Sequence, residues 1–155
     1  MIKIEQMTEA NQSFFCEIWI PWLKVTTGAE PQVEDLQTMA SPVAYYEETG
    51  GAAFIAYLDG KPVGVVAVKG LGAAGFEFCK LVVDPIARGH GIGPRLIEAS
   101  IHFAREAGGP DLWLQSFNKL KPALKIYEAM GFEHSDPPEE MSVLQRTEVI
   151  MKMGL

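Results

Sequence analysis

Residues 88–93 read Arg-Gly-His-Gly-Ile-Gly, and they follow, after the four residues 84–87, the largely apolar stretch Phe-Glu-Phe-Cys-Lys-Leu-Val-Val at 76–83. The stretch predicts a buried strand, and the amphipathic spacing from about Pro94 onward predicts a helix. Because glycine has no side chain, a ligand can come close to its backbone. Glycine also adopts positive φ without strain. The amino end of a helix presents unpaired N–H groups and a partial positive charge. Together, these elements predict a cradle for an anion, most often phosphate or pyrophosphate.

Two familiar glycine-rich phosphate loops do not fit this segment. A P-loop needs Gly-x-x-x-x-Gly-Lys-Ser/Thr, but Pro94 follows the last glycine. A dinucleotide-binding loop needs Gly-x-Gly-x-x-Gly, and Leu96 stands where the third glycine belongs. A third pattern, Arg/Gln-x-x-Gly-x-Gly/Ala, is matched by Arg88, Gly91 and Gly93. Taken alone, the hexapeptide is also compatible with an ordinary strand-to-helix turn.

The bulk properties are those of one globular domain spanning residues 1–155. Hydrophobic residues make up 48% of the chain and charged residues 21%, which is ordinary for such a domain. No apolar run has the length of a membrane helix, and the first five residues lack the pattern of a secretory signal. Cys16 and Cys79 form no Cys-x-x-Cys motif. We therefore expect two reduced thiols in a cytoplasmic protein.

Charge is distributed unevenly along the chain. The net charge of −7 argues against a general nucleic-acid binder. Residues 61–125, which include the glycine loop, carry nine basic and five acidic residues, whereas the flanking segments are acidic. The acidic flanks favour either a cationic substrate such as an amine or a surface that keeps the protein in solution. The three histidines, His90, His102 and His134, show no ligand spacing, so no metal site is expected.

Periodicity and turn residues predict an α+β fold with the order β-α-α-β-β-β-α-β-α-β-β. Asp59-Gly60 predicts a tight hairpin. Asn11 is expected to cap a first helix that Pro21 kinks or divides, and Ile126 is expected on the inward face of the last helix. The predicted strands are 1–5, 52–58, 62–69, 76–83, 112–117, 132–134 and 148–153, and the predicted helices are 11–24, 33–39, one from about 94 and one from about 122, with a further helical turn at 45–48.

Several landmarks resemble those of a known family. They are the hairpin sequence at 60–68, the strand and glycine loop at 76–93, and the set Asn118, Ala123, Tyr127, Gly131 and Phe132. On these landmarks the chain resembles the GNAT superfamily of acetyl-CoA-dependent N-acetyltransferases along nearly its whole length. Residues 14–23 are similar to a bacterial subgroup with Trp-Ile or Trp-Leu in its first helix. The resemblance implies a mixed, mainly antiparallel sheet of about seven strands with about four flanking helices, and leaves a homodimer open.

The resemblance also implies a reaction. An acetyl group would pass from acetyl-CoA to a primary amine, on either a small molecule or a protein, by direct attack in a ternary complex, without a metal. Glu77, an isolated carboxylate in the central strand, is the candidate base. Tyr127 is the candidate acid that protonates the departing thiolate. The alternatives are a Glu77 paired with Lys80 or exposed on the sheet, and a Tyr127 that only packs and anchors its hydroxyl.

The resemblance assigns the remaining positions to the cofactor. Backbone atoms of Leu81, Val82 and Val83 would bind the pantetheine arm and the acetyl carbonyl, in a V-shaped cleft where the strand separates from its neighbour. Arg88 and the loop amides would bind the pyrophosphate, and Arg95 or Lys121 the 3′-phosphate. The expected cofactor-binding set is Leu81, Val82, Val83, Arg88, Gly89, His90, Gly91, Ile92, Gly93, Pro94, Arg95, Asn118, Lys121 and Ala123.

Other interpretations of function remain open at this point. The same fold serves as a non-catalytic acyl-CoA-binding or regulatory domain, or as a transferase for a longer acyl group. A nucleotide-binding module of another fold would also use a glycine loop. Four aromatic residues of the first helices either line an acceptor pocket or pack in the core: Trp19, Trp22, Tyr45 and Tyr46. Glu17 either attracts a cationic amine or faces solvent.

Overall fold

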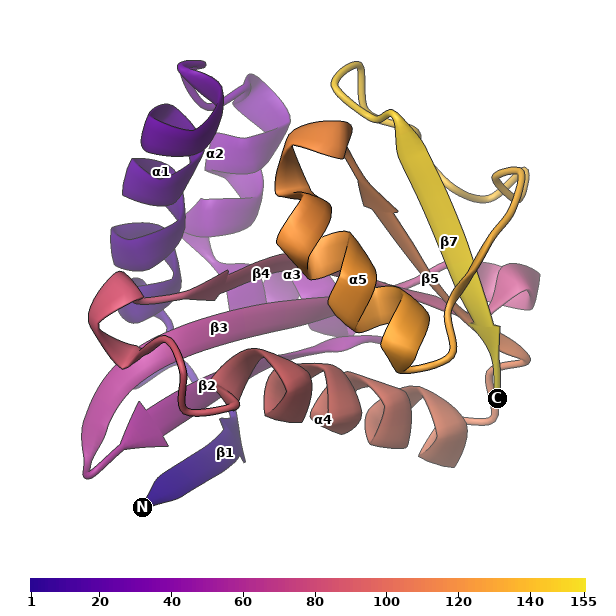
Figure 1. The fold of residues 1–155 in the computed structure, drawn as a ribbon. Coiled ribbons are helices and arrows are strands. Elements are labelled where there is room, and N and C mark those ends of the chain that lie inside the picture. Colours follow the sequence, from indigo (N-terminus) through magenta and orange to yellow (C-terminus); the bar gives the residue numbers. More distant parts are fainter.

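The computed structural model describes residues 1–155 as a seven-stranded sheet with helices on both faces (Figure 1). The strand order is β1-β2-β3-β4-β5-β7-β6, and only β4 and β5 pair in parallel. None of the helices combines the length and apolar character needed to cross a membrane. The elements are β1 (Ile2–Gln6), α1 (Ser13–Thr27), α2 (Val33–Ala40), α3 (Pro42–Glu48), β2 (Ala52–Leu58), β3 (Lys61–Gly70), β4 (Phe76–Val83), α4 (Ile92–Glu106), β5 (Asp111–Ser116), α5 (Lys121–Ala129), β6 (Glu133–His134) and β7 (Val149–Gly154).

The predicted strands and the α+β class are confirmed, and three helix details differ. There are five α-helices, because α3 forms a full helix with Pro42 in its first turn, where a missing N–H costs nothing. Asn11 does not cap α1: its Oδ1 accepts from the amide of Thr8, and its Nδ2 donates to Tyr57. Pro21 does not divide α1, since buried side chains on both sides of it anchor one continuous helix.

The Asp59-Gly60 hairpin is confirmed. Both residues have positive φ, 51° and 83°, which is the backbone of a type I′ turn. This turn matches the twist of its flanking strands, and β2 and β3 pair from the turn as far as Ala52 and Val68, with one register shift at Ala56 and Tyr57. They form the rigid half of the sheet against which β4 lies.

The central strand β4 has one paired edge and one mostly free edge. It pairs with β3 as far as Val83, but it meets β5 at only two positions, Phe76 with Leu112 and Glu77 with Trp113. Beyond Glu77 the two parallel strands separate, as Figure 1 shows for β4 and β5. This opens the V-shaped cleft that the family resemblance implies.

A bulge in β4 changes which face its side chains reach. Lys80 has φ 55°, and the register against β3 shifts at this point. Phe78 packs in the core beneath α4 and α5, whereas Cys79 packs in the core beneath α1, α2 and α3. After the bulge the alternation is displaced by one residue, so Leu81 lies on the α4–α5 side and Val82 on the other.

The inward face of α5 differs from the expected one. Ile126 is 40% exposed, while Leu124 and Tyr127 are the buried residues of this helix. Positions three apart share one face of a helix, and Ile126 lies about 100° away from Tyr127 around the axis. Tyr127 is thereby the α5 side chain that reaches the sheet next to the cleft.

The closed end of the V depends on a glycine. Gly75 has φ 106°, and a Cβ there would lie 2.3 Å from the carbonyl oxygen of Asp111. We expect Gly75→Ala to lower the free energy of unfolding by about 2–4 kcal/mol, from backbone strain and this clash together. Gly28→Ala is the matched control, since Gly28 has φ 70° with nothing within 4 Å, and should cost about 1 kcal/mol. Urea denaturation measures both, and equal losses would contradict the close approach.

Candidate active site

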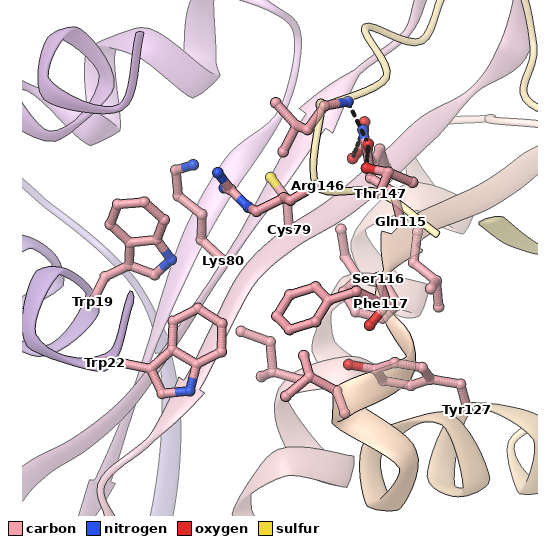
Figure 2. A pocket seen from close by; sticks show the side chains of 16 residues that line it. Trp19, Trp22, Cys79, Lys80, Gln115, Ser116, Phe117, Tyr127, Arg146 and Thr147 are labelled. Carbon is pink, nitrogen blue, oxygen red and sulfur yellow. Dashed lines mark hydrogen bonds between the residues drawn. The ribbon is translucent and has the colours of Figure 1, made fainter. Parts of the chain in front are cut away.

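A hollow of about 110 Å³ occupies the V between β4 and β5 (Figure 2). Its walls come from α1, β4, β5, α5 and the connection between β6 and β7. The lining residues are Trp19, Trp22, Glu77, Phe78, Cys79, Lys80, Leu81, Leu114, Gln115, Ser116, Phe117, Leu120, Tyr127, Leu144, Arg146 and Thr147. Segments far apart in the sequence thus meet where β4 leaves β5.

A second hollow of about 70 Å³ adjoins the first on the α2–α3 side. The two share Glu77, Cys79, Lys80, Gln115 and Leu144. Residues of α2 and α3, including Tyr45 and Tyr46, complete its lining. Glu77 therefore lies where the two hollows meet, accessible from both.

Glu77 is a buried carboxylate with one side-chain partner. It is 5% exposed, and Gln115 Nε2 donates to its Oε2 at 3.0 Å. Burial raises the pKa of Glu77, against the smaller lowering effects of the Gln115 hydrogen bond and of Lys69 and Lys80. Lys80 pairs with Asp35 at 3.2 Å and lies over the Trp19 ring instead. The two alternatives for Glu77, pairing with Lys80 and exposure on the sheet, are thus excluded.

Tyr127 presents a hydroxyl to the first hollow. Its ring packs against Phe78 and Phe132, with centroids 5.5 and 6.2 Å away. The residue is 7% exposed, and burial raises its pKa to about 12. Its hydroxyl makes no hydrogen bond within the protein and is not sealed off from the hollow. Figure 2 shows the oxygen pointing into the hollow, so the anchored-hydroxyl alternative does not apply.

The Gln115 side chain connects β4 to the β6–β7 connection through four hydrogen bonds. This residue was not identified from the sequence. Its Nε2 donates to Glu77 and to the carbonyl of Ser142, both at 3.0 Å. Its Oε1 accepts from the amide of Leu144 at 3.0 Å and from the hydroxyl of Thr147 at 2.5 Å. A glutamine inside an apolar strand was the one available signal. It gives no partner, because these contacts join residues about 30 positions apart.

Cys79 also lines both hollows, but its thiol is a weak nucleophile. Its Sγ donates to the Tyr46 hydroxyl at 3.8 Å. Burial, and to a lesser extent the charge of Glu77, raises the pKa of its thiol to about 11. The thiolate is the nucleophilic form of cysteine. Cys79 is therefore poorly suited to carry a covalent acyl intermediate.

The glycine loop presents a row of free amides. The N–H groups of Gly89, His90, Gly91, Ile92 and Gly93 donate to no protein acceptor. Gly89 and Gly91 have φ of 86° and 73°, a backbone conformation that glycine adopts without strain. They precede and begin the 15-residue helix α4, whose dipole adds a partial positive charge. These amides are therefore unpaired in the backbone, as the predicted anion cradle requires.

Two details of the cradle differ from expectation. Helix α4 begins at Ile92, so Pro94 is its third residue, still within the turn whose amides lack partners. The amide of Arg95 already donates to the carbonyl of Gly91, so it is not free for an anion. The Arg95 guanidinium donates to the carbonyl of Ile2. Arg88 is exposed beside the free amides.

Of the remaining expected positions, only Leu81 lines a hollow. Asn118, Lys121 and Ala123 line neither of them. Asn118 is exposed, and its backbone N–H donates to Glu148 Oε1 at 3.0 Å. This hydrogen bond orders the turn after β5. Leu81 lines the first hollow, and Val82 and Val83 continue along the free edge of β4 toward the glycine loop.

Of the candidate residues in the first helices, the aromatic ones line a hollow and the acidic one does not. Trp19 and Tyr46 belong to the core and also line a hollow, and Trp22 is only partly buried beside the first hollow. Glu17 is exposed and lies outside both hollows. No group of three His, Cys, Asp or Glu side chains is arranged to hold a metal ion.

The sequence family agrees with this geometry. Residues 14–132 match the model of the Acetyltransferase (GNAT) family. The chain belongs to the GNAT family. It is 29% identical over 113 residues to the Escherichia coli protein named uncharacterized N-acetyltransferase YjgM, covering 71% of this chain and 64% of that protein. It is 33% identical over 116 residues to mouse probable N-acetyltransferase family 8 member 5, covering 71% of this chain and 51% of the mouse protein. The match thus spans half to two thirds of these relatives.

Solved GNAT structures share the fold. A Staphylococcus aureus acetyltransferase of the GNAT family superposes with a TM-score of 0.89 at 19% identity, covering 99% of each chain. The Salmonella typhimurium putative acetyltransferase yncA, solved with its cofactor acetyl-CoA, gives a TM-score of 0.77 at 16% identity, covering 99% of this chain and 93% of that one. The GNAT fold predicted from the sequence is therefore confirmed.

The pKa of Cys79 makes its reactivity testable. In a Cys16→Ser variant, where Cys79 is the remaining thiol, iodoacetamide at about pH 7.5 should alkylate the folded protein at least about a hundredfold more slowly than the urea-unfolded chain. Two pKa units remove that much thiolate, and burial slows access further. Mass spectrometry of timed samples measures both rates. Similar rates in the two states would contradict the protonated, buried thiol.

Proposed function

We propose that this chain is an acetyl-CoA-dependent N-acetyltransferase that acts on a primary amine by direct attack in a ternary complex. The observation that carries the proposal is the pairing of two groups in one hollow: the buried Glu77 carboxylate and the unbonded Tyr127 hydroxyl. Membership of the GNAT family supports acetyl transfer, and the acetyl-CoA bound to the Salmonella typhimurium yncA protein supports the cofactor.

Coenzyme A would lie along the free edge of β4. The five free amides of residues 89–93 would bind the pyrophosphate, with Arg88 adding a cation. The amide groups of the pantetheine arm would hydrogen-bond to the backbone of Leu81 and Val83, as a strand would, where β5 is absent. This direction leads from the glycine loop toward Glu77. The thioester would then arrive in the first hollow.

The step itself needs one base and one acid. The amine loses a proton to Glu77, and its nitrogen attacks the acetyl carbonyl carbon to form a C–N bond. A backbone N–H near Val82 would polarise the carbonyl oxygen. The C–S bond then breaks, its electron pair goes to sulfur, and Tyr127 gives the thiolate a proton. The acylated nitrogen loses its second proton through solvent, which returns a proton to Tyr127. The products are the N-acetyl amine and coenzyme A.

The environments of the two groups suit these roles. Burial raises the pKa of Glu77 toward that of a more effective base, while Gln115 keeps one of its oxygens in place. With a pKa of about 12, Tyr127 is protonated before transfer and able to donate. The protonated Cys79 disfavours an acetyl-enzyme route through this thiol. Both cysteines are free, which supports a reducing compartment such as the cytoplasm as the proposed location.

The decisive experiment is a transfer assay paired with calorimetry. Protein, acetyl-CoA and a panel of amines are mixed, and release of free thiol is followed, while calorimetry measures coenzyme A binding. Thiol release that depends on both protein and amine is the expected result. Binding of coenzyme A without thiol release would favour a non-catalytic acyl-CoA-binding domain, and faster turnover with propionyl- or succinyl-CoA would favour a longer acyl group. Absence of coenzyme A binding would overturn the proposal.

Glu77→Gln should lower kcat by about a hundredfold near neutral pH and by less as the pH rises. Glutamine cannot take the proton, but at high pH the amine is already free and needs no base. The wild-type rate should rise with pH through the raised pKa of Glu77, and this dependence should vanish in the variant. Thiol release across the pH range measures it. Glu98→Gln, an exposed carboxylate on α4, is the control, and equal pH profiles for wild type and Glu77→Gln would contradict the role.

Tyr127→Phe should lower kcat by about ten- to a hundredfold and leave coenzyme A affinity nearly unchanged. The ring still packs against Phe78 and Phe132, so the fold is kept, and only the proton donor is lost. Steady-state kinetics and calorimetry separate the two quantities. An unchanged kcat, or a loss of affinity that accounts for the whole effect, would contradict proton donation.

A further inference from the structure

Arg146 brings an unpaired positive charge into the first hollow. Its side chain is half-buried and lines the hollow, yet it makes no salt bridge or hydrogen bond within the protein. Figure 2 shows the guanidinium extending from the β6–β7 connection toward the wall that carries Lys80 and Trp19. Lys80 is already paired with Asp35. Arg146 is therefore the cation in this hollow that still lacks an anion.

The backbone around Arg146 is held by the same side chain that holds the base. Gln115 Oε1 accepts from Leu144 and Thr147, the residues on either side of the 145–146 pair. Gln115 Nε2 donates to Glu77. One amide thus sets the position of both the carboxylate and the turn that presents the guanidinium. The two charged groups are thereby held in a fixed arrangement relative to each other.

The first hollow presents one unpaired group of each charge. Its ionisable acidic and basic residues are Glu77, Lys80 and Arg146, and since Lys80 is paired with Asp35, the Glu77 carboxyl and the Arg146 guanidinium remain without an ionic partner. The acidic flanks seen in the sequence do not change this balance within the first hollow, since Glu17, for example, lies outside it. An amine acceptor that also carries an anionic group would complement both the Glu77 carboxyl and the Arg146 guanidinium.

Building on the proposed function, we propose that the acceptor is an amine that carries a carboxylate, as a free amino acid does, and that Arg146 binds this carboxylate. A guanidinium matches a carboxylate with two parallel hydrogen bonds. The ammonium of such a zwitterion would face Glu77, which takes its proton before the nitrogen attacks the thioester. Trp19 and Trp22 offer apolar surface for the rest of the molecule. The product would be an N-acetyl amino acid, and coenzyme A leaves with the proton given by Tyr127.

The test compares matched acceptors that differ in the carboxylate alone. Phenylalanine, methionine and leucine are each assayed against their α-carboxamides by thiol release from acetyl-CoA, with the full chain. We expect kcat/KM to favour at least one acid over its amide by about tenfold or more. The amine of an amide is less basic and so more often free at neutral pH. Intrinsic reactivity would therefore favour the amide, and a preference for the acid must come from binding.

Variants assign the preference to one residue. Arg146→Gln should remove most of the acid-over-amide preference, mainly through KM, while turnover of the amide stays close to wild type. Arg146→Lys should retain part of the preference, since lysine keeps the charge but not the planar donor pair. Lys125→Gln removes the same charge from an exposed position of α5 outside the hollow and should change nothing.

The outcomes separate this proposal from the function on which it rests. Equal turnover of acids and amides, or a preference that survives Arg146→Gln, overturns the carboxylate site and leaves acetyl transfer intact. Failure of every acceptor to release thiol, in protein that binds acetyl-CoA, overturns acetyl transfer to amines and this proposal with it.

Discussion

The two-residue parallel contact between β4 and β5 is the constraint on which the rest of the site depends. Gly75 and Asp111 fix the strands at one end, and the strands then diverge. The divergence leaves one edge of β4 without a partner in the middle of a sheet, where backbone groups ordinarily pair. A ligand that carries amide groups along its length is the natural partner for such an edge.

The bulge at Lys80 gives that edge two different faces. Before it, Glu77 and Cys79 share the side covered by α1, α2 and α3. After it, Leu81 lies on the side of α4 and α5, where the glycine loop begins the helix. The strand therefore carries the Glu77 carboxyl on one face of the sheet and leads to the glycine loop on the other face. The cost is a lysine at positive φ, which its pairing with Asp35 and its position over Trp19 help to hold.

Local patterns predicted what is local. The glycine loop, the Asp59-Gly60 turn and the seven strands follow from residues adjacent in the sequence, and the resemblance pointed to Glu77 and Tyr127 before their surroundings were known. The residue at which α4 begins and the continuity of α1 across Pro21 depend on packing against the rest of the fold. Hydrophobic periodicity carries no information about that packing. Gln115 and Arg146 were missed because the fold, and not the local sequence, brings them beside β4. A lysine at the bulge gave no signal either, since glycine is the residue expected at positive φ.

The division of labour between sheet and connection has a consequence for how such a protein diversifies. The proposed base and acid belong to β4 and α5, whereas the Arg146 guanidinium is carried by the 135–148 connection, which is tied to the sheet through Gln115. Exchanging that connection while retaining its attachment to Gln115 would present other side chains to the same reactive centre. On the proposed mechanism, selectivity would be separate from catalysis, and grafting this one segment would be a direct route to changing the acceptor.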